Sequence, residues 1–437
     1  MKTKTFQLIA HVTRLCCFCA IFTAFLVGYT VASAYALPRY EGTGSCSSSN
    51  CHGATKARKS TNVLQNEYTT WASHDKHSKA YTNLMTSDAK KMAKHLGISD
   101  ATKEPLCLRC HATYVADTSL QGEKYSVEDG VSCESCHGAS QNWLTSHAER
   151  GATHEQNLKN GLHDTYSLNA RAKLCLSCHY GNTKQQVTHK LYGAGHPRLT
   201  FELDTYSILE PKHWVVDEDY KKRKGAYIPA KTWLTGQLEH SIALATQLQD
   251  PSFVRRGMLP ELSIFDCYSC HHPLKLNQWK ERSYAKEPGS LKLNLAPLLL
   301  LQAGLSKVDP EKARKLAELT ERIHHSFSDK GAVDSLLKLQ RFLQESVRPM
   351  VQALNYSPQT TRQLFSGLLA FGEATPFPTF EVAEQLGMGL QSILATNPDI
   401  RSQHGKDLDA LFDVLRSADD FRPNAFARII LRLKTSE

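Results

Sequence analysis

The C-terminal third of the chain places apolar residues at a helical period. From Val333 to Leu354 they recur every three or four positions, which predicts one amphipathic helix. Asp309-Pro310-Glu311 predicts another helix, expected to reach Phe327, since proline suits the first helical turn and acidic side chains suit the N-terminal end. Further helices are predicted over residues 360–371, 380–395, 408–415 and 424–433, with Pro376, Pro378, Pro398 and Pro423 between them.

Residues 37–284 have a different pattern. Long periodic segments are few there, and apolar side chains are sparse for the length of the region. This pattern predicts short helices and irregular structure with few strands, packed on something other than a large side-chain core. The fold class is therefore expected to be mainly α with much irregular structure, in two domains: residues 37–284, followed by an all-helical C-terminal domain at residues 285–437.

The cysteines follow one rule outside the N-terminal segment. The chain has 13 cysteines, three of which lie within residues 1–36. The other ten form five pairs, and a histidine directly follows the second cysteine of every pair. The pairs are Cys46 and Cys51 with His52, Cys107 and Cys110 with His111, Cys133 and Cys136 with His137, Cys175 and Cys178 with His179, and Cys267 and Cys270 with His271.

Cys-x-x-Cys-His is the attachment signature of c-type haem. The two thiols add to the two vinyl groups of one porphyrin, and the following histidine supplies a neutral imidazole as the proximal iron ligand. A zinc knuckle, a redox dithiol or a disulfide framework does not require a histidine after every second cysteine. The sequence therefore predicts five haem c groups, bound by these ten cysteines and five histidines, as the packing material of residues 37–284.

The first pair differs from the others in its spacing. Four residues separate Cys46 from Cys51, and the insert Ser-Ser-Ser-Asn is small and polar, so it can bulge without strain. A haem with a wider attachment loop is the preferred interpretation. An unmodified pair or a local disulfide is the alternative.

Each iron also needs a sixth ligand, or it stays open. Residues 37–272 contain eleven histidines besides those of the motifs, whereas methionines are few and not clustered. Bis-histidine ligation is therefore favoured over histidine–methionine ligation. It predicts low reduction potentials, because a methionine ligand raises the potential.

Residues 1–36 have the pattern of an export signal. Lys2, Lys4 and Arg14 form a basic start, residues 15–31 are mostly apolar, and the small-x-small cleavage patterns Ala32-Ser33-Ala34 and Ala34-Tyr35-Ala36 follow. Cleavage is the preferred interpretation, and an uncleaved membrane anchor is the alternative. Either interpretation predicts a periplasmic or exported protein, a compartment that is compatible with covalent haem attachment.

The charge balance favours protein partners over nucleic acid. The chain has 52 Lys and Arg against 43 Asp and Glu; losing residues 1–36 removes three bases and no acids, which leaves a net charge near +6. Ten haem propionates would offset that excess, and the basic runs at residues 90–91 and 221–224 are short and are interpreted as solvated faces. Weak electrostatic docking to other redox proteins is expected, namely cytochromes or membrane quinol-linked complexes. Assembly into an oligomer is the alternative to a single chain.

Three segments carry a resemblance to a known family. They are residues 71–81, residues 130–147, which begin with Gly-Val-Ser-Cys-Glu-Ser-Cys-His-Gly, and residues 189–199. They resemble the multihaem cytochrome c family that includes the tetrahaem electron carriers of ammonia oxidation and, more distantly, hydroxylamine oxidoreductase. The chain departs from these carriers in having five motifs rather than four, a wider first spacing and a helical C-terminal region, so their partners and pathway do not transfer.

The resemblance implies a set of distal iron ligands. His189 and His196 bracket a Gly-Ala-Gly turn, which lets the backbone pass close to a porphyrin. His272 directly follows a motif histidine, so it must point elsewhere and could bind a neighbouring iron. The candidate distal ligands are His77, His147, His189, His196, His213 and His272.

Two functions follow as expectations. The first is an exported five-haem cytochrome that passes electrons between redox partners and needs no substrate pocket. The second is a reductase or oxidoreductase of a small nitrogen or sulfur compound at one five-coordinate haem; no Cys-x-x-Cys-Lys motif or other dedicated catalytic signature is present. A stack of haem chains running between subunits is a third, structural reading.

Overall fold

A computed structural model describes residues 37–59, 63–254, 259–271, 291–326, 331–375 and 379–435. Within these ranges the protein is helical and has no named strand, only three isolated β-bridges. The predicted mainly α fold class is therefore confirmed. The predicted export signal at residues 1–36 lies outside the described residues. None of the described helices is both long and apolar enough to cross a membrane.

The N-terminal half consists of short helices joined by 3₁₀ turns and loops. Its buried apolar residues form two small clusters, one around Tyr81 and Leu108 and one around Leu176 and Phe201. This sparse packing agrees with a region whose interior depends on something besides side chains. The helices are α2 (Glu67–His74), α3 (Ser87–Leu96), α4 (Pro105–His111), α5 (Cys133–His137), α6 (His154–Lys159), α7 (Leu168–His179), α8 (His189–Gly193), α9 (Leu203–Leu209) and α10 (Glu218–Lys224).

The C-terminal half is a bundle of longer helices around one large hydrophobic core. A five-residue π-helical turn, η9 (Leu343–Val347), separates two of them. The helices are α11 (Pro229–Gln249), α12 (Pro251–Val254), α13 (Ala296–Leu305), α14 (Pro310–Ser326), α15 (Ala332–Phe342), α16 (Arg348–Ala353), α17 (Pro358–Ala374), α18 (Phe380–Thr396), α19 (Pro398–Val414) and α20 (Pro423–Thr435).

The predicted C-terminal helices are found with two differences. The single helix expected from Val333 to Leu354 contains the π turn, so it is divided into α15 and α16. The helix expected to begin at Leu408 begins at Pro398, because the Asn397 side chain caps its N-terminus and proline fits the first turn. Pro398 therefore starts a helix rather than separating two.

Helix α11, like α13, is an element that the sequence pattern did not reveal. Fifteen of its 21 residues are buried, around its whole circumference, so it carries no amphipathic stripe. Trp233 is fully buried, and a Cβ on Gly389 of α18 would lie 2.8 Å from its indole, so only glycine allows these helices to approach so closely. The hydrophobic core therefore begins at Ala230, upstream of the domain boundary expected at residue 284.

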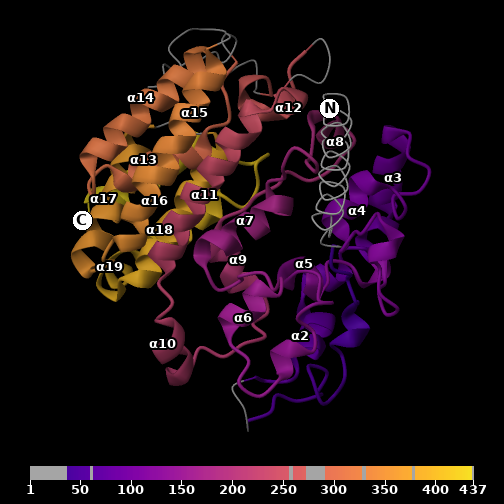
Figure 1. The fold of residues 1–437 in the computed structure, drawn as a ribbon. Coiled ribbons are helices and arrows are strands. Elements are labelled where there is room, and N and C mark those ends of the chain that lie inside the picture. Colours follow the sequence, from indigo (N-terminus) through magenta and orange to yellow (C-terminus); the bar gives the residue numbers. More distant parts are fainter. Residues whose placement is uncertain are drawn as a thin grey trace, which may run out of the picture.

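Helix α11 joins the two halves of the molecule. It packs against α7 and α9 on one side and against α13, α15, α16 and α18 of the bundle on the other. Figure 1 shows it between the indigo and magenta N-terminal half and the orange and yellow bundle. The motif-bearing helix α7 thus lies directly on the bundle.

Candidate haem sites

The cysteine–histidine motifs occupy helix ends and tight turns. Sites 1 to 5 denote the motifs that end in His52, His111, His137, His179 and His271. Helices α4, α5 and α7 each end at the motif histidine of sites 2, 3 and 4. Site 1 follows the 3₁₀ turn η1 (Thr43–Ser45), and site 5 lies on η8 (Cys267–Ser269). All ten motif cysteines have free thiols, so none is in a disulfide.

Every motif histidine faces one further histidine from a distant part of the chain. The distances between ring centroids fall in a narrow range. The pairs are His52 with His147 at 6.2 Å, His111 with His196 at 6.5 Å, His137 with His213 at 6.4 Å, His179 with His77 at 6.1 Å and His271 with His189 at 6.3 Å.

This spacing fits an iron atom between the two rings. An imidazole nitrogen lies roughly 2 Å from a first-row metal and about 1.1 Å from its own ring centre, so two rings on one iron have centroids about 6.3 Å apart. Direct contact between two rings would bring the centroids closer, as in the edge-to-face pair of Tyr180 and His240 at 4.4 Å. The residues present therefore fit bis-histidine haem.

Hydrogen bonds orient many of these rings through Nδ1, which leaves Nε2 free for a metal. His111 donates to the Ala80 carbonyl at 2.9 Å and His196 to the Pro197 carbonyl at 2.8 Å. His147 donates in the same way to the Trp143 carbonyl at 3.1 Å. These contacts fix both the tautomer and the direction of each ring.

Two rings donate instead to carboxylates. His52 of site 1 lies 2.9 Å from Glu67 Oε2, and His77, opposite site 4, lies 3.0 Å from Asp75 Oδ1. The hydrogen bond to the carboxylate raises the pKa of each histidine above its ordinary value. Sequence reasoning missed both carboxylates; the Asp-x-His spacing could have indicated Asp75, whereas nothing in the sequence marks Glu67.

Burial keeps two proximal histidines neutral. It lowers the pKa of His137 to about 4, and it lowers the pKa of His179 to about 4 as well. An imidazole must be neutral to bind a metal. Both side chains are therefore in the ligand form at neutral pH.

Residues around site 3 explain the Gly-Val-Ser-Cys-Glu-Ser-Cys-His-Gly segment. Gly130 has φ +71°, and a Cβ there would lie 2.7 Å from the His77 carbonyl oxygen. Val131 N donates to that same oxygen at 3.0 Å, which ties the motif to the segment carrying His77. The buried Glu134 carboxylate accepts from the backbone N–H groups of Glu41, Gly42 and Ser140, so it ties residues 41–42 to the segment that carries the motif of site 3.

Contacts between motifs bring the sites into neighbouring pairs. The thiols of Cys46 in site 1 and Cys133 in site 3 lie close enough to shift each other's pKa, which is lowered for Cys46 and raised for Cys133. Cys178 of site 4 contacts site 2, because its thiol lies 4.0 Å from the carbonyl oxygen of Arg109. Sites 3 and 4 share the half-buried Glu210, whose charge acts on the thiols of both.

Sites 2 and 5 are linked through α8. His189, which faces site 5, begins this helix, and His196, which faces site 2, lies three residues after its last residue, Gly193. The Gly195 between them has φ +107°, which allows the sharp turn. One short segment therefore serves two sites.

Other predicted or surplus residues do not join these pairs. His272 lies outside the described residues. His240 packs on Tyr180, and His95 lies 3.5 Å from the Ala194 carbonyl oxygen, so neither faces a motif histidine. Among the residues that the structure describes, no group of three or more His, Cys, Asp or Glu is placed to hold a metal ion by itself.

The comparison with protein families bears on the first three motifs. A family model described as cytochrome c554 and c-prime matches residues 45–138. Residues 45–138 belong to the cytochrome c554 and c-prime family. No curated protein and no solved structure matches the chain.

The cytochrome c554 match supplies the cofactor and the class of activity. The family consists of multihaem c-type cytochromes, so haem c and electron transfer follow for this protein. The matched segment holds all six cysteines of sites 1 to 3, including Cys46 and Cys51 with their wider spacing. Cytochromes of this type are typically extracytoplasmic, in agreement with the predicted export.

Replacing Asp75 with asparagine is expected to raise the reduction potential of site 4. A carboxylate that accepts from an axial imidazole makes that ligand more basic and favours ferric iron. If the preference changes about tenfold, the one-electron potential rises by about 60 mV. Spectroelectrochemical titration of the holoprotein measures this shift. Asp100→Asn, at an exposed carboxylate, is the control, and equal curves for both variants would contradict the assigned role.

The buried Glu202 predicts a dependence of stability on pH. Burial raises the pKa of Glu202 to about 7, whereas an unfolded glutamate titrates near about 4.3. The folded protein binds this proton more tightly than the unfolded chain does, so the contribution of Glu202 to stability is greatest below about pH 4 and falls by roughly 3 kcal/mol as pH rises towards 7. Chemical unfolding at several pH values measures the slope. Glu202→Gln should flatten it and the exposed Glu155→Gln should not; parallel slopes would refute the prediction.

Proposed function

We propose that the protein is an exported cytochrome with five c-type haems that transfers electrons between redox partners. The observation that carries this proposal is the pairing of every motif histidine with one further imidazole, at centroid distances of 6.1–6.5 Å. Haem, when bound, supplies a one-electron iron couple. The chain itself holds two imidazoles at each site and sets the distances between sites.

The contacts between motifs support a linear order of sites. Site 1 neighbours site 3, site 3 shares Glu210 with site 4, Cys178 of site 4 contacts Arg109 of site 2, and α8 links site 2 to site 5. The proposed electron path therefore runs 1–3–4–2–5. Sites 1 and 5 are its two ends.

The opposing imidazoles favour a carrier over the alternative reductase. Reduction of a small nitrogen or sulfur compound needs an open iron, and each motif histidine in the described ranges has a facing imidazole. Cytochromes or membrane quinol-linked complexes remain the proposed partners. The export signal predicted at residues 1–36 supports a periplasmic location.

Haem counting and electron paramagnetic resonance test the proposal. The pyridine haemochrome of the purified protein should give five haems per chain, and the oxidised protein should contain low-spin iron alone. A high-spin signal that shifts with nitrite or hydroxylamine would favour the reductase. A count of four would remove site 1, with its wider cysteine spacing, from the haem sites.

A further inference from the structure

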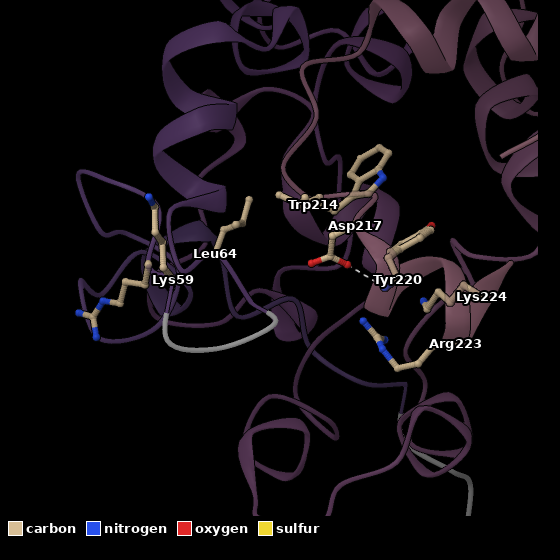
Figure 2. A pocket seen from close by; sticks show the side chains of 9 residues that line it. Lys59, Leu64, Trp214, Asp217, Tyr220, Arg223 and Lys224 are labelled. Atoms are coloured by element: carbon tan, nitrogen blue, oxygen red, sulfur yellow. Dashed lines mark hydrogen bonds between the residues drawn. The ribbon is translucent and has the colours of Figure 1, made fainter. Parts of the chain in front are cut away.

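A cationic cleft opens beside sites 1 and 3. Its volume is about 410 Å³, and no motif cysteine or histidine lines it. Figure 2 shows Lys59 on one side and Trp214, Arg223 and Lys224 on the other. Arg58 also lines the first side, so four cationic side chains surround one space.

The single acidic side chain of the cleft is already engaged. Asp217 caps α10 by accepting from the Tyr220 backbone N–H at 2.8 Å, an interaction drawn in Figure 2. Arg223 donates to Asp219 at 2.8 Å, and Lys224 lies 4.5 Å from the centre of the Tyr166 ring. With Arg223 paired to Asp219, the remaining cations Arg58, Lys59 and Lys224 still outnumber Asp217, so the cleft keeps a net positive charge.

Both walls connect to the proposed electron path. Trp214 meets the ring of its neighbour His213 edge to face, with centroids 5.1 Å apart, and His213 faces His137 of site 3. On the other wall, Arg58 donates to the carbonyl of Ser49 at 2.8 Å, and Ser49 lies in the attachment loop of site 1. The cleft thus lies at the site 1 end of the order 1–3–4–2–5.

We infer that this cleft is the docking site for the acidic face of a redox partner protein, and that Trp214 lies on the electron path between that partner and site 3. The inference rests on the proposed function and adds the partner's chemistry and the place of contact. Transient redox complexes bury small interfaces and depend on electrostatic steering. Val215, beside Trp214, is 51 % exposed and supplies an apolar contact within the cationic rim.

Stopped-flow reduction of the oxidised holoprotein by an acidic ferredoxin tests the inference. Two double variants each reverse the charge of one wall of the cleft: Arg58→Glu/Lys59→Glu and Arg223→Glu/Lys224→Glu. Lys338→Glu/Arg341→Glu, at exposed residues of α15, makes the same charge change on the bundle and is the matched control. Each cleft variant should lower the bimolecular rate constant about tenfold at low ionic strength, and the loss should disappear at about 0.5 M salt.

The outcomes separate the two proposals. Reduction by dithionite should consume five electrons per chain in every variant; fewer in the unaltered protein would overturn the proposed function. If dithionite gives five and the control loses as much rate as the cleft variants, the docking site alone is refuted. Trp214→Leu should lower the limiting rate at saturating ferredoxin and keep the salt dependence; an unchanged limiting rate would refute Trp214 as part of the path.

Discussion

Replacing His77 with alanine is expected to convert one of the five irons from low spin to high spin. His77 is the imidazole that faces His179, with ring centroids 6.1 Å apart. Without it, the iron of site 4 loses its sixth ligand and becomes open to small ligands. Electron paramagnetic resonance of the oxidised variant should show a new high-spin signal equal to about one fifth of the iron, because each chain has five motifs.

His95→Ala is the matched control for this substitution. His95 lies nearby in sequence on α3 and faces no motif histidine. The control should keep all irons low-spin and bind no added cyanide. If His77→Ala stays fully low-spin, the ligand of site 4 is a different residue and the pairing at that site is wrong.

Replacing Glu239 with alanine is expected to lower the free energy of unfolding by about 3–5 kcal/mol. The Glu239 side chain has no exposed surface; it accepts two hydrogen bonds from Arg348, at 2.8 and 3.0 Å, and one from Asn169 at 2.7 Å. Removing it leaves the guanidinium, 21 % exposed, without its opposite charge. Guanidinium-induced unfolding of the holoprotein, followed by circular dichroism, measures the loss.

An exposed ion pair serves as the comparison. Asp413 pairs with Arg416 at the surface, where the two side chains are 63 % and 79 % exposed, so Asp413→Ala should cost under about 1 kcal/mol. The double variant Glu239→Leu/Arg348→Met should recover much of the stability, because it leaves no unpaired charge. A similar small loss for Glu239→Ala and Asp413→Ala would mean that this contact does not hold α11 to its neighbours.

Local sequence signals located the motifs and the amphipathic helices. The motifs can be recognised because covalent haem attachment needs two cysteines and a histidine close together in sequence. The apolar periodicity also predicted α17, α18 and α20 with bounds close to those observed. Helix α11 was not predicted, because burial on all sides removes the apolar periodicity that marks a surface helix. Its polar residues Thr232 and Gln237 are buried too, which made the segment look unlike a core helix.

The sequence pattern does not show which histidine faces which motif in the folded chain. Eleven surplus histidines were available, and only the folded chain brings one of them opposite each motif. The resemblance to multihaem cytochromes supplied six candidates, of which His77, His147, His189, His196 and His213 face motif histidines. The roles of Glu67 and Asp75 depend on side-chain directions, which no spacing in sequence determines.

The histidine pairs also determine the order in which the haem sites would acquire their second histidine during export. If the chain is exported from its N-terminus, His77 crosses before His179, and His189 crosses before His271. At sites 4 and 5 the facing imidazole is therefore already present when the motif crosses. Sites 1, 2 and 3 must wait for His147, His196 and His213 to emerge. Sites 1, 2 and 3 would therefore all lack a second imidazole until His147 has crossed, and site 3 would lack it until His213, just before α10, has crossed.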